Sequence, residues 1–331
     1  MSRSGQDSGS EELNYLISQD VSRWFAFAPY YSYAGGGLYS ADDIDQWQVV
    51  YMVYLKDRLD HAWDLAQKSG TIPGYTNGLF RTIESENITR ERGQQRKIDD
   101  WLWLECREEE LGASLEESMW TSQTICRQVA EAFSWKPDVI TLISVALKDA
   151  DTPWRTGRAG YYVDKYPYDK IVLPPGIFTS STSVAAVLRH EYAHCMTTNS
   201  SRGHAPIWLS EAVSQVSGGA GIYARDRAFF SGEGEWHPPH SAGYGFALPD
   251  RDPKRAWAYR QSTVIGQYLN SLGGTTKIGE MLRAHADESF LPRLEQTLVG
   301  QDRTDAAMRK VYGHSTAQVF EQAREWLKAQ V

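Results

Sequence analysis

A five-residue motif inside an apolar segment is the strongest constraint on how this chain folds. The motif is His190-Glu-Tyr-Ala-His194, within the segment VAAVLRHEYAHCM. Histidines four residues apart project from one face of an α-helix, so both imidazoles can reach a single metal ion. Because the segment is apolar, the rings are expected to be half buried and to need a partner, which Zn²⁺ supplies. The motif therefore predicts a partly buried helix that contributes two zinc ligands.

Glu191 has a different role from the two histidines in this interpretation. It lies about 100° around the helix from His190, so its carboxylate can reach a metal-bound water without ligating the metal. That position predicts a general base that activates water. The opposing interpretation is an exposed helix whose histidines simply titrate near neutral pH, and the apolar flanks of the motif argue against it.

A catalytic zinc site needs a third protein ligand and one open position. The chain downstream of the motif offers three candidates for this ligand: His204, Asp226 and Glu211. His204 falls on a predicted loop, and Asp226 falls in an irregular region. Glu211 lies inside a second predicted helix, and a helix antiparallel to the first would deliver its carboxylate from the opposite side. Glu211 is therefore the favoured third ligand.

The pattern of apolar residues predicts an α+β fold that is mainly helical. Helical spacing indicates helices over residues 41–68, 98–112 and 114–135. The texture changes near residue 138, where the β-branched run VITLISVAL indicates a strand, and YYVDKYPYDKIVLPP offers two more around a turn. We expect these strands to form a small mixed β-sheet packed on the helix that carries the motif.

The second half of the chain predicts two central helices, a long loop and a C-terminal helical lobe. The central helices span about residues 181–198 and 206–216, with Pro206 at the first helical position of the second. Residues 219–251 are rich in Gly, His, Ser and Pro, which is typical of an irregular loop. From residue 252 onward helices are expected, with breaks at Gly273-Gly274, Leu291-Pro292 and Gly313.

We divide the chain into three regions on these grounds. Residues 1–120 form a mostly helical N-terminal region to which the sequence assigns no chemistry. Residues 121–251 form the catalytic core, with the sheet and the two central helices. Residues 252–331 form a C-terminal helical subdomain.

Charge and cysteine content exclude several classes of function. The 331 residues include 42 acidic and 34 basic ones, and no basic stripe with interleaved aromatics is present, so nucleic acid is not expected as a partner. The three cysteines form no Cys-x-x-Cys pair. No apolar run reaches the roughly 18 residues that span a bilayer, and the start lacks an apolar signal segment, so no membrane association and a cytoplasmic location are expected.

The motif followed by Trp208-Leu-Ser-Glu211-Ala resembles the gluzincin zinc metallopeptidases, in particular the peptidase-MA-like group with its thermolysin-like catalytic core. The strand ending in IVLPPG resembles the active-site edge strand of that superfamily, which lies antiparallel to bound peptide. The segment from Ala258 to Leu269 and the later AAMRKVYG resemble the downstream helices of the group. The resemblance covers about residues 121–331.

The resemblance implies a zinc-dependent hydrolase that cleaves peptide bonds. His190, His194 and Glu211 would hold Zn²⁺, and Glu191 would act as general base on the attacking water. Tyr259 would stabilise the oxyanion, with the histidines at 204, 237 and 240 as alternatives. Gln215, one turn after Glu211, would orient a zinc-binding imidazole.

Some features of the family pattern are altered or missing. Ala212 follows the glutamate where many relatives have Gly, and the Gly-x-Met-Glu-Asn signature of aminopeptidases is absent, which favours an endopeptidase acting on a peptide or protein. A non-hydrolytic protein that uses zinc for structure or recognition is the alternative from another class. Within the enzyme interpretation, the first 120 residues would either support the fold or cover the cleft. The sequence does not reveal the oligomeric state.

Overall fold

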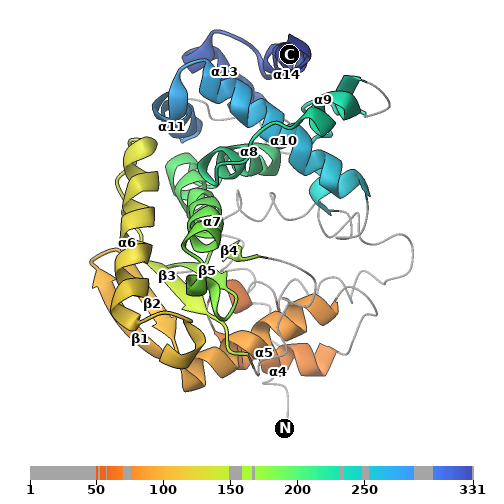
Figure 1. The fold of residues 1–331 in the computed structure, drawn as a ribbon. Helices are drawn as coiled ribbons and strands as arrows, with labels where there is room; N and C mark the ends of the chain where they lie inside the picture. The colour runs from red at the N-terminus through yellow and green to blue at the C-terminus, as the bar shows by residue number, and fades with distance from the viewer. Residues whose placement is uncertain are drawn as a thin grey trace.

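The computed structural model describes residues 50, 53–56, 58–69, 76–148, 159–165, 168–231, 235–247, 253–286 and 301–329. Over these residues the chain is mainly helical with one small mixed sheet, which confirms the predicted α+β class (Figure 1). The single helix predicted over residues 41–68 is wrong, because residues 53–55 are helical, Lys56 lies in a turn and a separate helix begins at Leu59. Residues 41–49 of that prediction, and the predicted break at Leu291-Pro292, lie outside the described residues. None of the helices described is both long and apolar enough to cross a bilayer.

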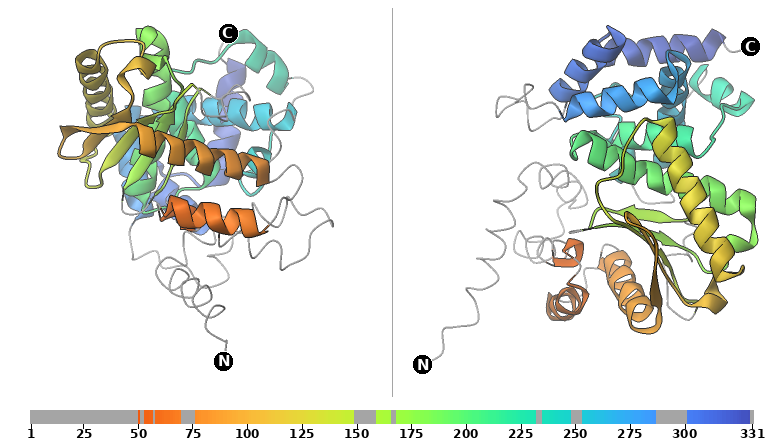
Figure 2. Two further views of the ribbon diagram at one scale, coloured as in Figure 1. Left: turned by 90° about the horizontal axis from the view of Figure 1, so that it is seen from below. Right: turned by 90° about the vertical axis from the view of Figure 1, so that its left-hand side faces the viewer.

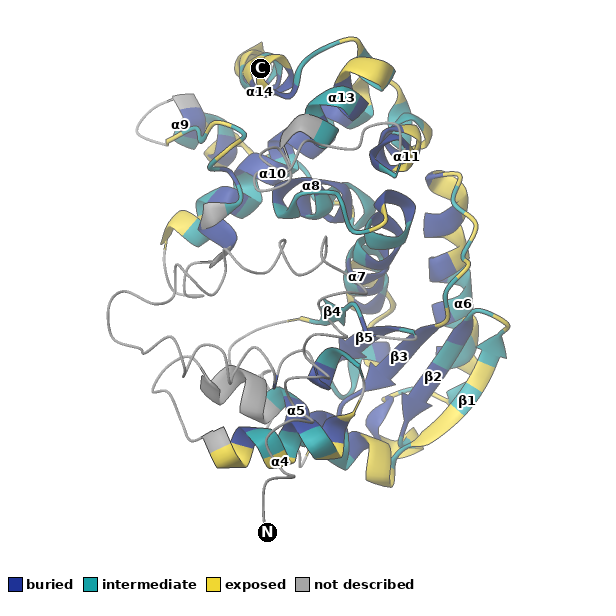
Figure 3. Cartoon of the chain, turned by 180° about the vertical axis from the view of Figure 1, so that it is seen from behind, coloured by how far each residue is buried: buried dark blue, intermediate teal, exposed yellow. Residues whose placement is uncertain are grey.

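Within the described part of the chain the sheet has five strands, in the order β1-β2-β3-β5-β4. The pairs β2–β3 and β3–β5 are parallel, and the two edge strands β1 and β4 pair antiparallel with their neighbours. The central strands are buried, whereas β1 is largely exposed (Figure 3). The structure confirms the strands predicted after residue 138. The strand bounds are Gln94–Asp99, Leu102–Cys106, Thr141–Val145, Tyr161–Val163 and Asp169–Leu173 for β1 to β5.

The helix predicted over residues 98–112 is wrong. The segment WLWLEC lies in strand β2 and the turn before it, and β2 pairs with β1 and with β3. Its alternate residues Leu102, Leu104 and Cys106 are all buried, which is the period of a strand. A short apolar run fits both the period of a helix and the period of a strand, so its sequence alone does not distinguish them. Pairing with β3 makes this segment a strand. The sheet therefore includes residues on both sides of the predicted boundary at residue 120.

Helices cover both faces of the sheet (Figures 1 and 2). On one face lie α6 (Leu115–Ala132) and α7 (Ser181–Ser201), which confirm two predicted helices. Each begins at a serine whose side chain accepts a hydrogen bond from the backbone three residues later, Ser114 from Glu117 and Ser180 from Ser183. On the other face lie α4 (Leu59–Ser69) and α5 (Thr76–Arg92). The sheet is thus buried between two helical layers.

Helix α8 (Ile207–Ser217) follows α7 and confirms the second central helix, although Pro206 is its N-cap in extended conformation and not its first helical residue. The region 219–251 was predicted to be an irregular loop, and this is wrong in part, because it contains α9 (Ala224–Ser231) and the 3-10 turn η4 (Tyr244–Ala247). Both segments are anchored by aromatic packing: Phe230 contacts Trp236, and Phe246 contacts Tyr259.

The described C-terminal helices are α10 (Pro253–Ser271), α11 (Gly274–His285), α13 (Gln301–Tyr312) and α14 (Thr316–Ala329), so the predicted breaks at Gly273-Gly274 and Gly313 are confirmed. Of these, α11 packs on α7 and α10 packs on α8. Helix α10 approaches α8 closely, because a β-carbon on Gly266 would lie 2.4 Å from the Ala212 carbonyl oxygen. This contact fixes α8 at the residue that follows Glu211.

A buried cluster of charges joins the N-terminal helices to the sheet. Glu86 of α5 lies 3.1 Å from the ammonium groups of both Lys165 and Lys170, and Lys170 lies 3.3 Å from Glu105 of β2. The hydroxyl of Tyr54 also donates to Glu86. Burial raises the pKa of Glu86, but the two lysines and Tyr54 outweigh it and lower this pKa to about 2. Two carboxylates therefore balance two ammonium groups inside the protein.

Replacing Glu86 by Gln should lower the free energy of unfolding at pH 7 by about 3 kcal/mol, because it leaves two buried ammonium groups facing one carboxylate. Urea unfolding measures the loss. The contribution of Glu86 is complete above its ordinary pKa of 4.5 and is lost as pH falls through about 2, so the difference from wild type should narrow over that window. Glu84→Gln on the same helix is the control, and an equal loss in both variants would contradict this role for the cluster.

Candidate metal centre

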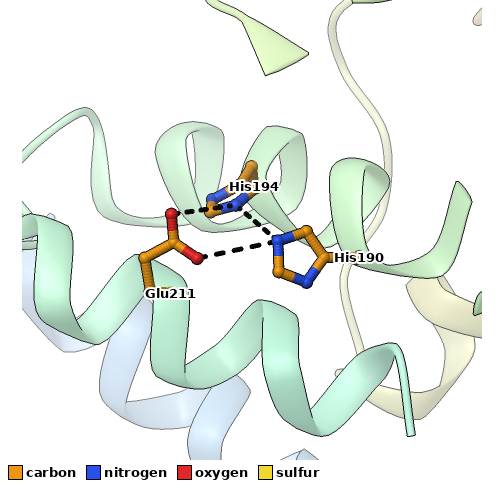
Figure 4. Close-up of side chains that lie close together, drawn as sticks. All are labelled: His190, His194 and Glu211. Atoms are coloured by element: carbon orange, nitrogen blue, oxygen red, sulfur yellow. Dashed lines mark hydrogen bonds and ion pairs between the residues drawn. The ribbon is translucent and has the colours of Figure 1, made fainter. Parts of the chain in front are cut away.

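The structure brings together the three predicted ligands, from two helices packed side by side. His190 and His194 project from α7, and Glu211 projects from α8 toward both rings (Figure 4). The Nε2 atoms of the two histidines are 3.2 Å apart. The Glu211 carboxylate oxygens lie 3.6 Å from Nε2 of His190 and 3.7 Å from Nε2 of His194. All three ligand atoms fall within 4.8 Å of one another.

These separations suit a tetrahedral Zn²⁺ ion. Zinc binds imidazole nitrogen and carboxylate oxygen at about 2.0–2.2 Å, which places neighbouring ligand atoms of a tetrahedron about 3.3–3.6 Å apart. The observed separations of 3.2, 3.6 and 3.7 Å lie close to that range. The imidazole–imidazole–carboxylate set is also one that catalytic zinc sites use.

Two serines of α8 orient the imidazoles. Nδ1 of His194 lies 2.8 Å from Oγ of Ser210, and the imidazole of His190 donates a hydrogen bond to the backbone carbonyl of Ser214. Such bonds fix the ring plane and direct the remaining nitrogen to the metal. The sequence predicted Gln215 for this task, and that prediction is wrong: the neighbouring serines hold the rings, while the Gln215 carbonyl accepts from Ala220.

Burial makes every charge in this group unfavourable. It lowers the pKa of His190 to about 4 against the effect of the Ser214 carbonyl, and it lowers the pKa of His194 well below its usual value with help from His190. Burial raises the pKa of Glu211 to about 8, although the positive charge of Arg255 opposes it. Both imidazoles are therefore neutral at pH 7 and present nitrogen lone pairs to the same point.

The donor set fits a divalent cation for a further reason. Oε2 of Glu211 is buried and accepts no hydrogen bond. A buried carboxylate oxygen without a partner is costly, and a cation between it and the two nitrogens would satisfy all three groups. The side chain of His190 is 22% exposed, so one ligand of the group is partly open to solvent. These features match an open site more closely than a closed structural one.

Of the two predicted catalytic residues, Glu191 is next to a ligand in the chain, and Tyr259 lies on α10, the helix that packs on α8. Glu191 is buried on α7 beside His190, as the motif requires. Tyr259 lies on α10, where its ring packs edge-on against Phe246 at 4.9 Å. The guanidinium of Arg255, which affects the pKa of Glu211, lies 5.9 Å from the centre of the Tyr259 ring. The catalytic roles of Glu191 and Tyr259 stay predictions.

The alternative ligands are not part of the group. Within the described residues the metal-compatible set comprises His190, His194 and Glu211, without His204 or Asp226. Asp226 instead caps the start of α9 through the backbone of Tyr223 and pairs with Arg260.

The loop histidines have other surroundings. Gln261 binds the backbone N–H and carbonyl of His237, at 2.9 and 2.6 Å, and His240 is exposed. The backbone N–H of His204 donates to Ser201 at the end of α7. Nothing in these contacts connects any of the three with the oxyanion role that the sequence offered as an alternative.

Other residues near the motif pack the two helices. Trp208 packs edge-on against Phe320 at 4.8 Å, and Leu209 is fully buried. Cys195 is buried and lies outside the ligand group, but its thiol also donates to Asp169. Ser210 and Arg255 were missed. The position of Ser210 directly before Glu211 was a usable signal, whereas the proximity of Arg255 to Glu211 depends on how α10 packs.

No protein-family model matches this chain, and neither a curated protein nor a solved structure is detectably similar to it. The chain's own residues alone therefore support a metal centre, through the separation, burial and chemistry of the three ligand atoms.

Replacing Ser210 by Ala should weaken zinc binding about 10- to 100-fold, because the His194 ring loses the bond that fixes its orientation. Competition with a chromogenic chelator measures the affinity, and circular dichroism checks the fold. Ser210→Thr keeps the hydroxyl and should bind zinc nearly as well as wild type. Unchanged affinity in the Ala variant would show that Ser210 does not orient the ligand.

Proposed function

We propose that this chain is a zinc-dependent peptidase of the gluzincin type that cleaves internal peptide bonds. The convergence of His190, His194 and Glu211 from two helices carries the proposal. In this proposal the sheet supports α7 and helix α10 supports α8, so that the ligand-bearing faces of the two helices are held together. The resemblance of the two helical motifs to gluzincins adds the reaction class.

The residues around the centre have distinct tasks in this mechanism. Zn²⁺ held by the three ligands would lower the pKa of a bound water to about 7 and polarise the substrate carbonyl. Glu191 takes a proton from the attacking water while the water oxygen bonds to the carbonyl carbon. It then gives this proton to the amine nitrogen as the C–N bond breaks. Tyr259 donates a hydrogen bond to the oxyanion.

Strand β4 is where an extended substrate would lie. It forms one edge of the sheet, pairs antiparallel with β5, and lies against α7. A peptide that adds to a sheet edge gains main-chain hydrogen bonds that do not depend on its sequence. An edge strand beside the ligand helix therefore supports an endopeptidase, because the peptide can extend past the site in both directions.

The test separates metal binding from chemistry. We expect Glu191→Gln to retain about one zinc per chain and to lose cleavage of casein and of a peptide library, because the amide cannot accept the proton. Glu211→Ala should lose zinc as well as activity, because two imidazoles alone hold the metal weakly. Elemental analysis and fluorogenic peptide assays give the two readouts.

The outcomes also separate the competing functions. Zinc bound by wild type without cleavage of any peptide would favour the non-hydrolytic alternative. Normal activity in Glu191→Gln would exclude its role as base, and zinc retained in Glu211→Ala would exclude the third ligand.

Inhibition by the N-terminal region needs a test that leaves the sheet intact. Removing the chain up to Ser114 would delete strands β1 and β2. Limited proteolysis before Val50 keeps all five strands and also α4, α5 and the Glu86 cluster that holds the far face of the sheet. If residues before Val50 cover the cleft, the cut protein should cleave peptides faster than the intact chain, and an equal or lower rate would contradict inhibition by that segment.

A further inference from the structure

Gly160 directly precedes strand β4, where the chain passes next to Glu191. A β-carbon built on Gly160 would lie 2.8 Å from Cγ1 of Val187, 3.3 Å from Cγ of Glu191 and 3.4 Å from its Oε1. The first distance is shorter than real contacts allow, the second is tight, and the third is at the lower limit of ordinary van der Waals contact. Any side chain at this position would therefore compete with the carboxylate of the proposed general base.

The close approach at Gly160 continues along β4, because Tyr162 also faces a residue of α7. It follows Gly160 by two residues, so both face the same side of the strand. Its ring lies nearly parallel to that of His194, with centroids 6.2 Å apart and planes 14° apart. Its hydroxyl donates to Oδ1 of Asp169 at 2.7 Å. The strand thus places Gly160 over Glu191 and Tyr162 over His194.

The opposite face of β4 prevents the strand from moving away. Val163 packs against the N-terminal apolar cluster, whose buried members include Val50 and Val53. Two residues further on, Lys165 is buried, donates to the Tyr54 carbonyl at 3.0 Å and pairs with Glu86. A strand held on both faces cannot retreat to admit a side chain. An added group at residue 160 must be accommodated by Val187 and Glu191.

We propose that Gly160 is a positioning residue for hydrolysis: by having no side chain, it keeps open the space in which the Glu191 carboxylate moves between the attacking water and the leaving amine. The inference rests on the proposed function. A methyl group at residue 160 would restrict the carboxylate to one position. The main loss should be in kcat, because the ligands and the outer edge of β4 are unchanged.

The experiment separates this role from simple packing. Gly160→Ala is compared with Val187→Ala and with the double variant, in which the 2.8 Å clash is removed but the contacts with Glu191 remain. Gly221→Ala is the matched control, because a β-carbon there meets nothing within 4 Å. Each protein is measured for thermal midpoint, for zinc affinity by chelator competition, and for kcat and KM on a fluorogenic peptide that wild type cleaves.

We expect the double variant to unfold at the same temperature as Val187→Ala and to bind zinc with the affinity of wild type. Its kcat should remain about 100-fold below that of Val187→Ala, the scale of a misplaced catalytic group, with KM changed less than threefold. Recovery of kcat in the double variant would show that Gly160 serves packing alone. A zinc-loaded wild type that cleaves no peptide would overturn the proposed peptidase function itself, and the inference with it.

Discussion

The contact between α7 and α8 is the interaction on which the rest of the structure depends. Neither helix can form the centre alone, since the imidazoles come from one and the carboxylate from the other. The helices come close where α8 ends, because a β-carbon on Gly218 would lie 3.4 Å from Cβ of His190. On the far side of α8, Gly266 admits the Ala212 carbonyl in the same way. The two glycines therefore allow α8 to pack closely against both neighbouring helices, and this packing fixes the position of Glu211 relative to the two imidazoles.

The N-terminal helices contribute to the centre indirectly. Their charges and apolar side chains hold the far face of β4 and β5, through Glu86 and the cluster around Val53. The near face of β4 then meets α7 in a fixed register. This gives the first third of the described chain a physical task, which is to keep the edge strand against the helix of the proposed active site.

The electrostatics of the centre point to a cation. Burial opposes charge on both histidines and on Glu211, so the group in isolation holds neutral rings and a carboxyl group of high pKa. Arg255 contributes one positive charge nearby. A divalent ion would provide the charge that favours ionised Glu211 and would use the nitrogen lone pairs at the same time.

The sequence by itself determined the candidate ligand set and the helices that carry it. Two residues four apart on a helix lie on the same face, so the spacing of His190 and His194 places both imidazoles together. Glu211 lies within a second helix whose sequence has clear start and stop signals. The strands after residue 138 were equally readable, because β-branched runs bounded by turns are distinctive. These features are local, so the order of residues is enough to specify them.

Only the tertiary structure decided the rest. The sequence of β2 predicted a helix, but the segment pairs with β3 and its alternate residues are buried in the sheet. The choice of Ser210 over Gln215 as the partner of an imidazole depends on how α8 is rotated against α7. The fit of Gly160 beside Glu191 depends on contacts between segments about 30 residues apart. Such contacts arise from packing between elements, and the periodicity of one segment contains no information about the distance to another.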